Sequence, residues 1–221
     1  AWDQPAQGRV AGPPLAGVEA LADWTLGRLD AAGVARADFV GHSMGSLVGL
    51  EAAARAPQRV NHLVMVATAY PMKVSDALLT TAREQPLRAI DMVNVFSHSS
   101  IASKPSFPGP GMWLHGSNRA LMRRMLAGAT GLDGSNLFEH DFRVCDRYAN
   151  GLQAAGKVRC PVTLVLGERD QMTTPKYTRD IAQALRAHTV TLPAGHTLMT
   201  EAPDGVLNAL REALARPVEH S

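Results

Sequence analysis

The chain has 221 residues, which fits one domain or one domain with a large insertion. Its hydrophobic content of 46% and charged content of 19% describe a globular protein with enough apolar side chains to build a core. A formal net charge of +2, scattered along the chain, argues against a nucleic-acid partner, and no apolar run is long enough for a membrane span.

The chain has two cysteines, Cys145 and Cys160, and neither has histidine or cysteine neighbours at the spacing of zinc ligands. We expect two reduced, packed thiols in a cytoplasmic protein, with no disulfide and no bound metal. The first residues, AWDQP, lack the basic start and the apolar core of a secretory signal.

The first third of the chain alternates between helical and strand patterns. Residues 1–14 are rich in Gly and Pro and are expected to form a loop. Apolar residues at helical spacing predict a helix over 17–32. A strand candidate at 37–40 precedes a helix candidate at 46–56. Residues 60–67 are almost wholly apolar over the length of a strand, as expected for a strand that helices cover on both faces.

The middle of the chain, residues 70–155, has no comparable apolar strand. Helical patches are expected instead over 75–84, 86–95, 118–127 and 137–153. An insertion of this size between two core strands predicts a helical lid over residues 70–155.

Strands and helices alternate again after this insertion, with strand candidates at 162–167 and 189–192 and helix candidates at 175–185 and 204–215. Such alternation indicates an α/β fold with a mostly parallel sheet flanked by helices. The predicted organisation is therefore an α/β core made of residues 1–69 and 156–221, with the lid inserted between them.

The segment G-H-S-M-G at residues 41–45 lies between a strand and a helix, which is the context of a nucleophile elbow. A serine on so tight a turn has a strained backbone, and glycine at both ends of the segment is expected to prevent clashes. The turn would expose the Ser43 hydroxyl and aim the Met44 N–H at a developing oxyanion. His42 is expected to pack or face solvent, because its position points it away from Ser43. The alternative is a Gly-flanked serine in an ordinary loop.

Three polar residues follow the ends of predicted strands: Ser43, Asp170 and His196. In parallel sheets, ligands bind beyond these carboxyl ends. A serine hydroxyl needs a base, and an imidazole needs an acceptor on its far nitrogen. Alone, Asp170 could cap a helix and His196 could be a surface histidine, but their order and placement predict a triad.

Glu168 and Asp76 are weaker candidates for the acid. Four other histidines are expected on the surface or in the lid: His98, His115, His140 and His188.

The segments GHSMG, LVLGERDQMTTP and LPAGHTLMTEAPD together resemble the α/β-hydrolase superfamily, in its lid-bearing serine esterase and lipase-like branch. The resemblance implies Ser43 as the nucleophile, Asp170 as the acid and His196 as the base. The family also has earlier strands and an H-G oxyanion loop, which this chain lacks. Met44 is then the one identifiable oxyanion donor, and the loss of a donor can cost about a hundredfold in rate. We expect an N-terminally truncated fragment rather than a diverged short form.

These observations predict a serine hydrolase that needs no cofactor and cleaves a small-molecule carboxylic ester through an acyl-enzyme. Lactonase, C–C hydrolase and perhydrolase chemistry stay open. The alternative is a catalytically impaired fragment or pseudo-hydrolase that binds a small molecule or a protein. A sheet edge left unpaired could also join two copies into a homo-oligomer. Candidate substrate contacts, for which packing is an equally good interpretation, are His42, Met72, Met92, Phe96, Trp113 and Leu114.

Overall fold

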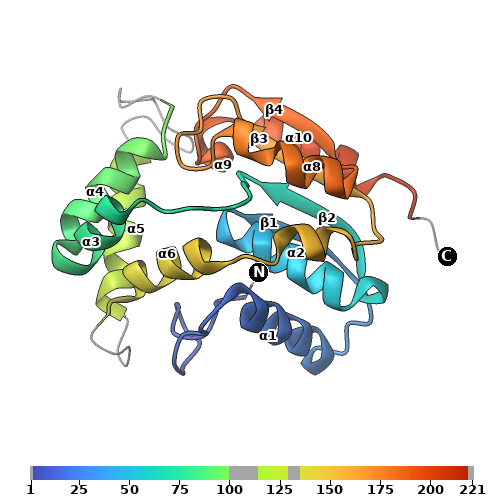
Figure 1. Ribbon diagram of the computed structural model, residues 1–221, viewed down its shortest axis with the longest axis horizontal. Helices are drawn as coiled ribbons and strands as arrows, with labels where there is room; N and C mark the ends of the chain where they lie inside the picture. The colour runs from blue at the N-terminus through green and yellow to red at the C-terminus, as the bar shows by residue number, and fades with distance from the viewer. Residues whose placement is uncertain (1, 100–113, 129–134, 219–221) are drawn as a thin grey trace.

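The computed structural model describes residues 2–99, 114–128 and 135–218. Its centre is a parallel sheet of four strands in chain order. Figure 1 shows this sheet among its flanking helices. The strands are β1 (Ala37–His42), β2 (Val60–Val66), β3 (Val162–Gly167) and β4 (His188–Leu192). The predicted α/β class with a parallel sheet is therefore confirmed.

Ten α-helices are described. They are α1 (Val18–Ala31), α2 (Met44–Arg55), α3 (Asp76–Glu84), α4 (Pro86–Phe96), α5 (Leu114–Gly128), α6 (Leu137–Arg147), α7 (Gly151–Ala155), α8 (Arg179–Leu185), α9 (Leu198–Glu201) and α10 (Pro203–Leu214). Two 3-10 segments, η1 (Pro57–Arg59) and η2 (Pro175–Thr178), precede β2 and α8. In the described ranges, none of these helices is both long and apolar enough to cross a bilayer.

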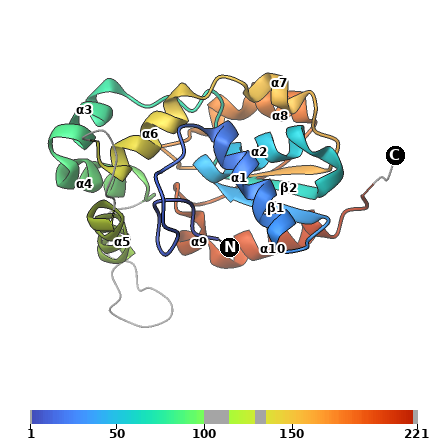
Figure 2. The same ribbon diagram turned by 90° about the horizontal axis from the view of Figure 1, so that it is seen from below.

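Helices cover both faces of the sheet, which explains why β2 and β3 are apolar on both sides. On β2, Leu63 and Met65 belong to a buried cluster with α2, α7 and α8. The alternate residues Val64 and Val66 pack with α9 and α10 on the opposite face. Figure 2 shows α7 and α8 on one side of the strands and α10 on the other.

The first strand, β1, lies at an edge of the sheet and pairs with β2 alone among the described strands. Its first four residues alternate between partly buried and exposed, and Val40 is 49% exposed.

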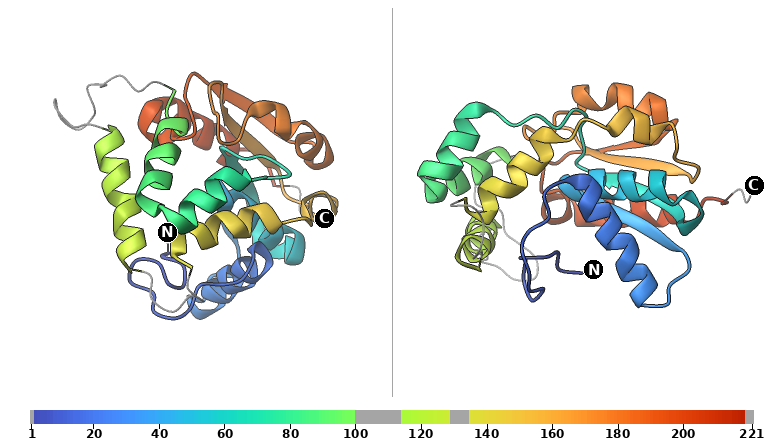
Figure 3. Two further views of the ribbon diagram at one scale, coloured as in Figure 1. Left: turned by 60° about the vertical axis from the view of Figure 1, so that its left-hand side comes forward. Right: turned by 60° about the horizontal axis from the view of Figure 1, so that its bottom comes forward.

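Helices α3–α6, called here the insertion helices, follow β2 in the sequence and lie together beside the sheet (Figures 1 and 3). They have a buried cluster of their own, which includes Ile90 of α4, Met122 of α5 and Phe138 of α6. The end of α6 also joins a second cluster, because Val144 and Cys145 pack with residues of α1 and α2.

The single helix expected over 137–153 is wrong, because the chain leaves the helical conformation between α6 and α7. Tyr148 has extended dihedrals, and its hydroxyl donates to Oε1 of the buried Glu51 at 2.8 Å. The Asn150 side chain donates to the same oxygen at 2.6 Å. These bonds to α2 satisfy a buried carboxylate, and they turn the chain so that α7 packs with the sheet rather than with the insertion helices.

Candidate active site

The turn after β1 has the geometry of a nucleophile elbow. Ser43 has φ 51° and ψ −121°, a strained conformation for a residue with a side chain. A Cβ on Gly41 would lie 2.1 Å from the carbonyl oxygen of Gly45, so residue 41 has to be glycine. The Ser46 hydroxyl, which is buried, donates to the Ser43 carbonyl at 2.6 Å and holds the turn in place.

The corresponding expectation for Gly45 is wrong. A Cβ there would meet no atom of the described residues within 4 Å, so glycine is not required for space at that position. Met44, in contrast, is the first residue of α2, where the main-chain N–H has no acceptor within the helix. That N–H is available to a ligand beside Ser43.

Asp170 lies in the turn after β3 and is held from two directions. Its Oδ1 accepts the main-chain N–H groups of Met172 and Thr173, each at 2.8 Å. Its Oδ2 accepts the Thr173 hydroxyl at 2.7 Å and Nδ1 of His196 at 2.9 Å. Both carboxylate oxygens are therefore occupied, and the orientation of the side chain is fixed.

Burial alone would raise the pKa of Asp170. The hydrogen bond and positive charge of His196, together with the bonds from Thr173, outweigh this effect and lower the pKa below its ordinary value. The carboxylate is ionised at neutral pH, so it accepts a hydrogen bond from the Nδ1–H group of His196. When an imidazole donates from Nδ1 and is neutral, its other nitrogen, Nε2, is the one that accepts.

His42 brings the elbow and the His196 loop together. Its Nε2 lies 2.8 Å from the carbonyl oxygen of His196, and the two imidazole centroids are 4.8 Å apart. Ser43 is the next residue in the chain. The described residues form no hydrogen bond between the Ser43 hydroxyl and His196. Such contacts are often long without substrate and shorten when one binds.

A cavity of about 280 Å³ opens beside Ser43. Three of the expected contacts line it, Met72, Met92 and Phe96, whereas His42 and Leu114 are not among its lining. Trp113 lies outside the described residues. Further lining residues, which the sequence did not predict, are Leu78, Phe142, Lys73, Val74, Ser75, Gln171, Met172 and Thr173. Helical spacing within 75–84 could have pointed to Leu78.

Cys145 also lines this cavity, which raises the question of a second nucleophile. Burial, and more weakly the carboxylates of Asp141 and Asp146, raise the pKa of its thiol to about 12. The thiolate is the reactive form of cysteine, so this thiol is unreactive at neutral pH. Both Cys145 and Cys160 are free thiols; Cys145 is buried and Cys160 is partly buried.

None of the remaining acid and histidine candidates lines the cavity beside Ser43. Glu168 and Asp76 are exposed and make no bond to His196 among the described residues. His98 and His115 are buried between insertion segments, with ring centroids 4.1 Å apart. His140 bonds to the Leu15 carbonyl oxygen at 2.9 Å, and His188 is exposed on β4.

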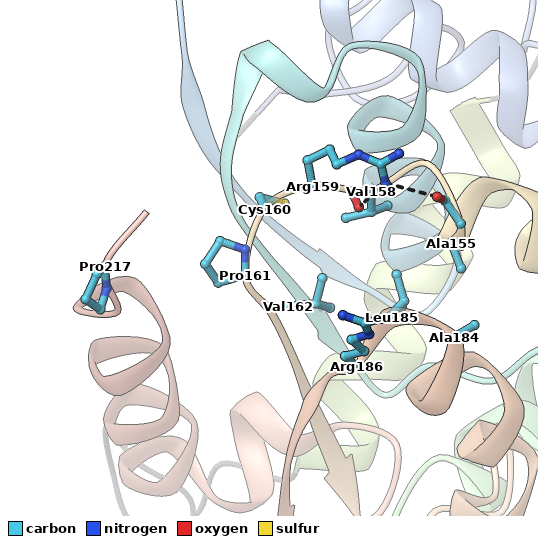
Figure 4. Close-up of a pocket in the computed structure, with 11 residues that line it drawn as sticks. Ala155, Val158, Arg159, Cys160, Pro161, Val162, Ala184, Leu185, Arg186 and Pro217 are labelled. Carbon is cyan, nitrogen blue, oxygen red and sulfur yellow. Dashed lines mark hydrogen bonds between the residues drawn. The ribbon is translucent and has the colours of Figure 1, made fainter. Parts of the chain in front are cut away.

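A larger hollow, of about 660 Å³, lies at the opposite end of the sheet (Figure 4). Its lining includes Cys160, Pro161 and Val162 at the start of β3, with Arg159 and Arg186 beside them. Ligands of parallel sheets bind at the carboxyl ends of the strands, and this hollow adjoins the amino end of β3. We therefore place the candidate active site at the smaller cavity.

Comparison with curated proteins finds relatives of low identity. The chain is 25% identical to a protein of Rhizobium rhizogenes named as a proposed carbamate hydrolase, RutD, over 83% of this chain and 68% of that protein. A relative with the same name from Agrobacterium fabrum is 26% identical, with the same coverage of both chains.

Solved structures share the fold at similar identity. A thermophilic esterase superposes with a TM-score of 0.79 and 22% identity, covering 96% of this chain and 78% of that one. The enol-lactonase of Burkholderia xenovorans LB400 gives a TM-score of 0.76 and 23% identity, covering 97% and 79%. Residues 13–203 match the family model described as the alpha/beta hydrolase fold. The chain therefore belongs to the α/β-hydrolase fold family.

Proposed function

We propose that this chain is a serine hydrolase that cleaves carboxylic esters through an acyl-enzyme. The observation that supports the proposal most strongly is the bond of 2.9 Å from His196 Nδ1 to the buried Asp170, on a loop that touches the elbow residue His42. This bond leaves His196 Nε2 as the acceptor for the proton of Ser43.

The proposed reaction has two halves. Ser43 Oγ attacks the ester carbonyl carbon while His196 takes the hydroxyl proton, and the Met44 N–H donates to the oxyanion. The C–O bond to the alcohol breaks, and His196 returns the proton to the departing alkoxide. Water then attacks the acyl-enzyme by the same route, releasing the acid and free Ser43.

We further propose that the insertion helices act as a lid over the reacting groups. Side chains of α3, α4 and α6, namely Leu78, Phe96 and Phe142, line the cavity that contains Ser43. Their apolar surfaces suit the hydrocarbon part of an ester. The cavity of about 280 Å³ lies at the low end of ligand-site volumes, which favours short acyl groups.

Hydrolysis of p-nitrophenyl esters of increasing acyl length tests this proposal. We expect kcat/KM for the butyrate to exceed that for the laurate by at least about tenfold, because the long acyl chain of the laurate overfills a cavity of about 280 Å³ and has to displace its lining to bind. Equal or faster cleavage of the laurate would contradict the assignment of the cavity. Absence of Ser43-dependent turnover on the whole series would favour the alternative, a binding module.

The names of the curated relatives favour a second candidate, carbamate hydrolysis. The carbonyl carbon of a carbamate is open to the same attack by Ser43, with an amine or an alcohol as the leaving group. The cavity offers polar groups, Lys73, Ser75 and Gln171, next to its apolar ones. The comparison of kcat/KM for a p-nitrophenyl carbamate and for the matching butyrate ester decides between the two candidates. A higher value for the carbamate favours carbamate hydrolysis, and a higher value for the ester favours ester hydrolysis.

A further inference from the structure

His42 connects two parts of the molecule that approach the candidate site from opposite edges of the sheet. It is the last residue of β1, the first strand of the sheet, whereas His196 lies in the loop after β4, the last strand. Its Nε2 is 2.8 Å from the His196 carbonyl oxygen, across 154 positions of sequence. This bond is the direct link between the residue before Ser43 and the backbone of His196.

The chemistry of the contact fixes the protonation state of His42. A carbonyl oxygen only accepts hydrogen bonds, so Nε2 of His42 carries the proton. Burial and the charge of His196 lower the pKa of His42 to about 4, although the bond to the carbonyl and the charge of Asp170 act in the opposite direction. His42 is therefore a neutral donor at neutral pH.

His42 is also a poor candidate for the base itself. Its proton-bearing Nε2 is already engaged with the carbonyl, and Asp170 bonds to the ring of His196 rather than to that of His42. A base whose pKa is near 4 also accepts a proton weakly at pH 7. The contact of His42 instead bears on the position of His196.

Other main-chain bonds of the His196 loop are made by neighbouring residues. The Ala194 carbonyl accepts the Arg169 N–H at 3.0 Å, and the Ala194 N–H donates to the Leu192 carbonyl at 2.8 Å. Gly195 N–H donates to Glu201, and Thr197 N–H donates to the Ser97 carbonyl at 3.1 Å. A Cβ on Gly195 would lie 2.7 Å from the Ser99 nitrogen, so the loop is closely packed there. At residue 196, the side chain is held by Asp170 and the carbonyl oxygen by His42.

We propose that His42 is a positioning residue, which holds the His196 carbonyl so that the imidazole of His196 stays in line with Ser43 and Asp170. This inference rests on the proposed hydrolase function, because it concerns the base of that reaction. It assigns the residue before the nucleophile to the geometry of the base instead of to substrate binding. A displacement of about 1 Å in a reacting group can cost about a hundredfold in rate.

The test compares three variants. His42→Leu removes the donor but keeps an apolar side chain, and His42→Gln keeps a neutral N–H near the place of Nε2. His140→Leu is the matched control, because His140 makes an equivalent bond of 2.9 Å to the Leu15 carbonyl, in a part of the chain that does not touch His196.

We expect His42→Leu to lower kcat for p-nitrophenyl butyrate by about 10- to 100-fold with KM changed less than about threefold. His42→Gln is expected to stay within about threefold of the unmodified chain, and so is His140→Leu. An unchanged kcat in His42→Leu would overturn the proposal. So would an equal loss in His42→Leu and His42→Gln, because the donor would then not be the feature that matters.

A second readout is independent of turnover. In ¹⁵N-edited NMR spectra, the His196 Nδ1–H proton bonded to Asp170 should exchange slowly with water in the unmodified chain and in His42→Gln, and rapidly in His42→Leu. The same exchange rate in all three would overturn the proposal even if His42→Leu folds poorly enough to confuse the kinetics. If no ester is cleaved but the exchange rates differ as expected, the positioning role stands and the hydrolase proposal fails.

Discussion

We expect Ser43→Ala to lower kcat for p-nitrophenyl butyrate by at least about 10⁴-fold. The alanine variant has no hydroxyl to form the acyl-enzyme, so the reaction can then proceed only by direct attack of water. The elbow itself should persist, because its strain is supported by Gly41 and by the Ser46 hydroxyl, which bonds to the main chain of residue 43.

The measurement is initial-rate hydrolysis, with substrate binding followed separately by titration of a non-hydrolysable amide analogue. Ser135→Ala is the matched control, since Ser135 lies before α6 and does not line the cavity. We expect the control to keep full activity and Ser43→Ala to bind the amide normally. If Ser43→Ala hydrolyses the ester at the rate of the unmodified chain, Ser43 is not the nucleophile.

The second large effect is expected for Asp170→Asn, with kcat lowered about 10⁴-fold. Oδ1 of Asp170 accepts two main-chain N–H groups, so an asparagine has to place its carbonyl oxygen there. Its NH₂ group then takes the place of Oδ2 and donates to Nδ1 of His196. This forces the His196 proton onto Nε2, and the ring can no longer accept the proton of Ser43.

Glu168→Gln is the control for this prediction, because Glu168 is an exposed carboxylate on the same turn. We expect it to leave kcat within about threefold of the unmodified chain. A large loss in Glu168→Gln together with a small one in Asp170→Asn would reverse the assignment of the acid.

Because the pKa of Asp170 is lowered in the folded chain, the difference in stability between Asp170→Asn and the unmodified chain should depend on pH. A carboxyl group whose pKa is lower in the folded chain stabilises the fold above its unfolded-state pKa, near 3.9, and loses this contribution as the pH falls through its folded value. We therefore expect Asp170→Asn to melt at a lower temperature than the unmodified chain at pH 7. The difference between the two melting temperatures should become smaller below about pH 4.

Most of the α/β architecture follows from local patterns in the sequence. The continuous apolar stretches at β2 and β3 predict buried strands because helices cover both faces of the sheet. The positions of Asp170 and His196 beyond strand ends predict that they come together, because parallel strands all end at one edge of the sheet.

What the sequence does not predict depends on contacts between distant residues. The end of α6 at Arg147 is set by two donors to the buried Glu51, which lies about 100 positions earlier. Thr173 binds the Asp170 carboxylate, but nothing in the sequence distinguishes it from a threonine in an ordinary loop. The sequence around His42 predicts only that this residue packs or faces solvent. Its contact with the His196 carbonyl depends on the fold, which brings together residues 154 positions apart.

Labelling by a fluorophosphonate probe tests the central claim most directly, because phosphorus reacts only with a serine hydroxyl that a nearby base has activated. The probe should modify Ser43 within minutes in the unmodified chain, as located by peptide mass spectrometry, and should leave His196→Gln unlabelled over the same period. Stoichiometric labelling of another residue, or equal labelling of Ser43 with and without His196, would contradict the account of a Ser43–His196–Asp170 active site.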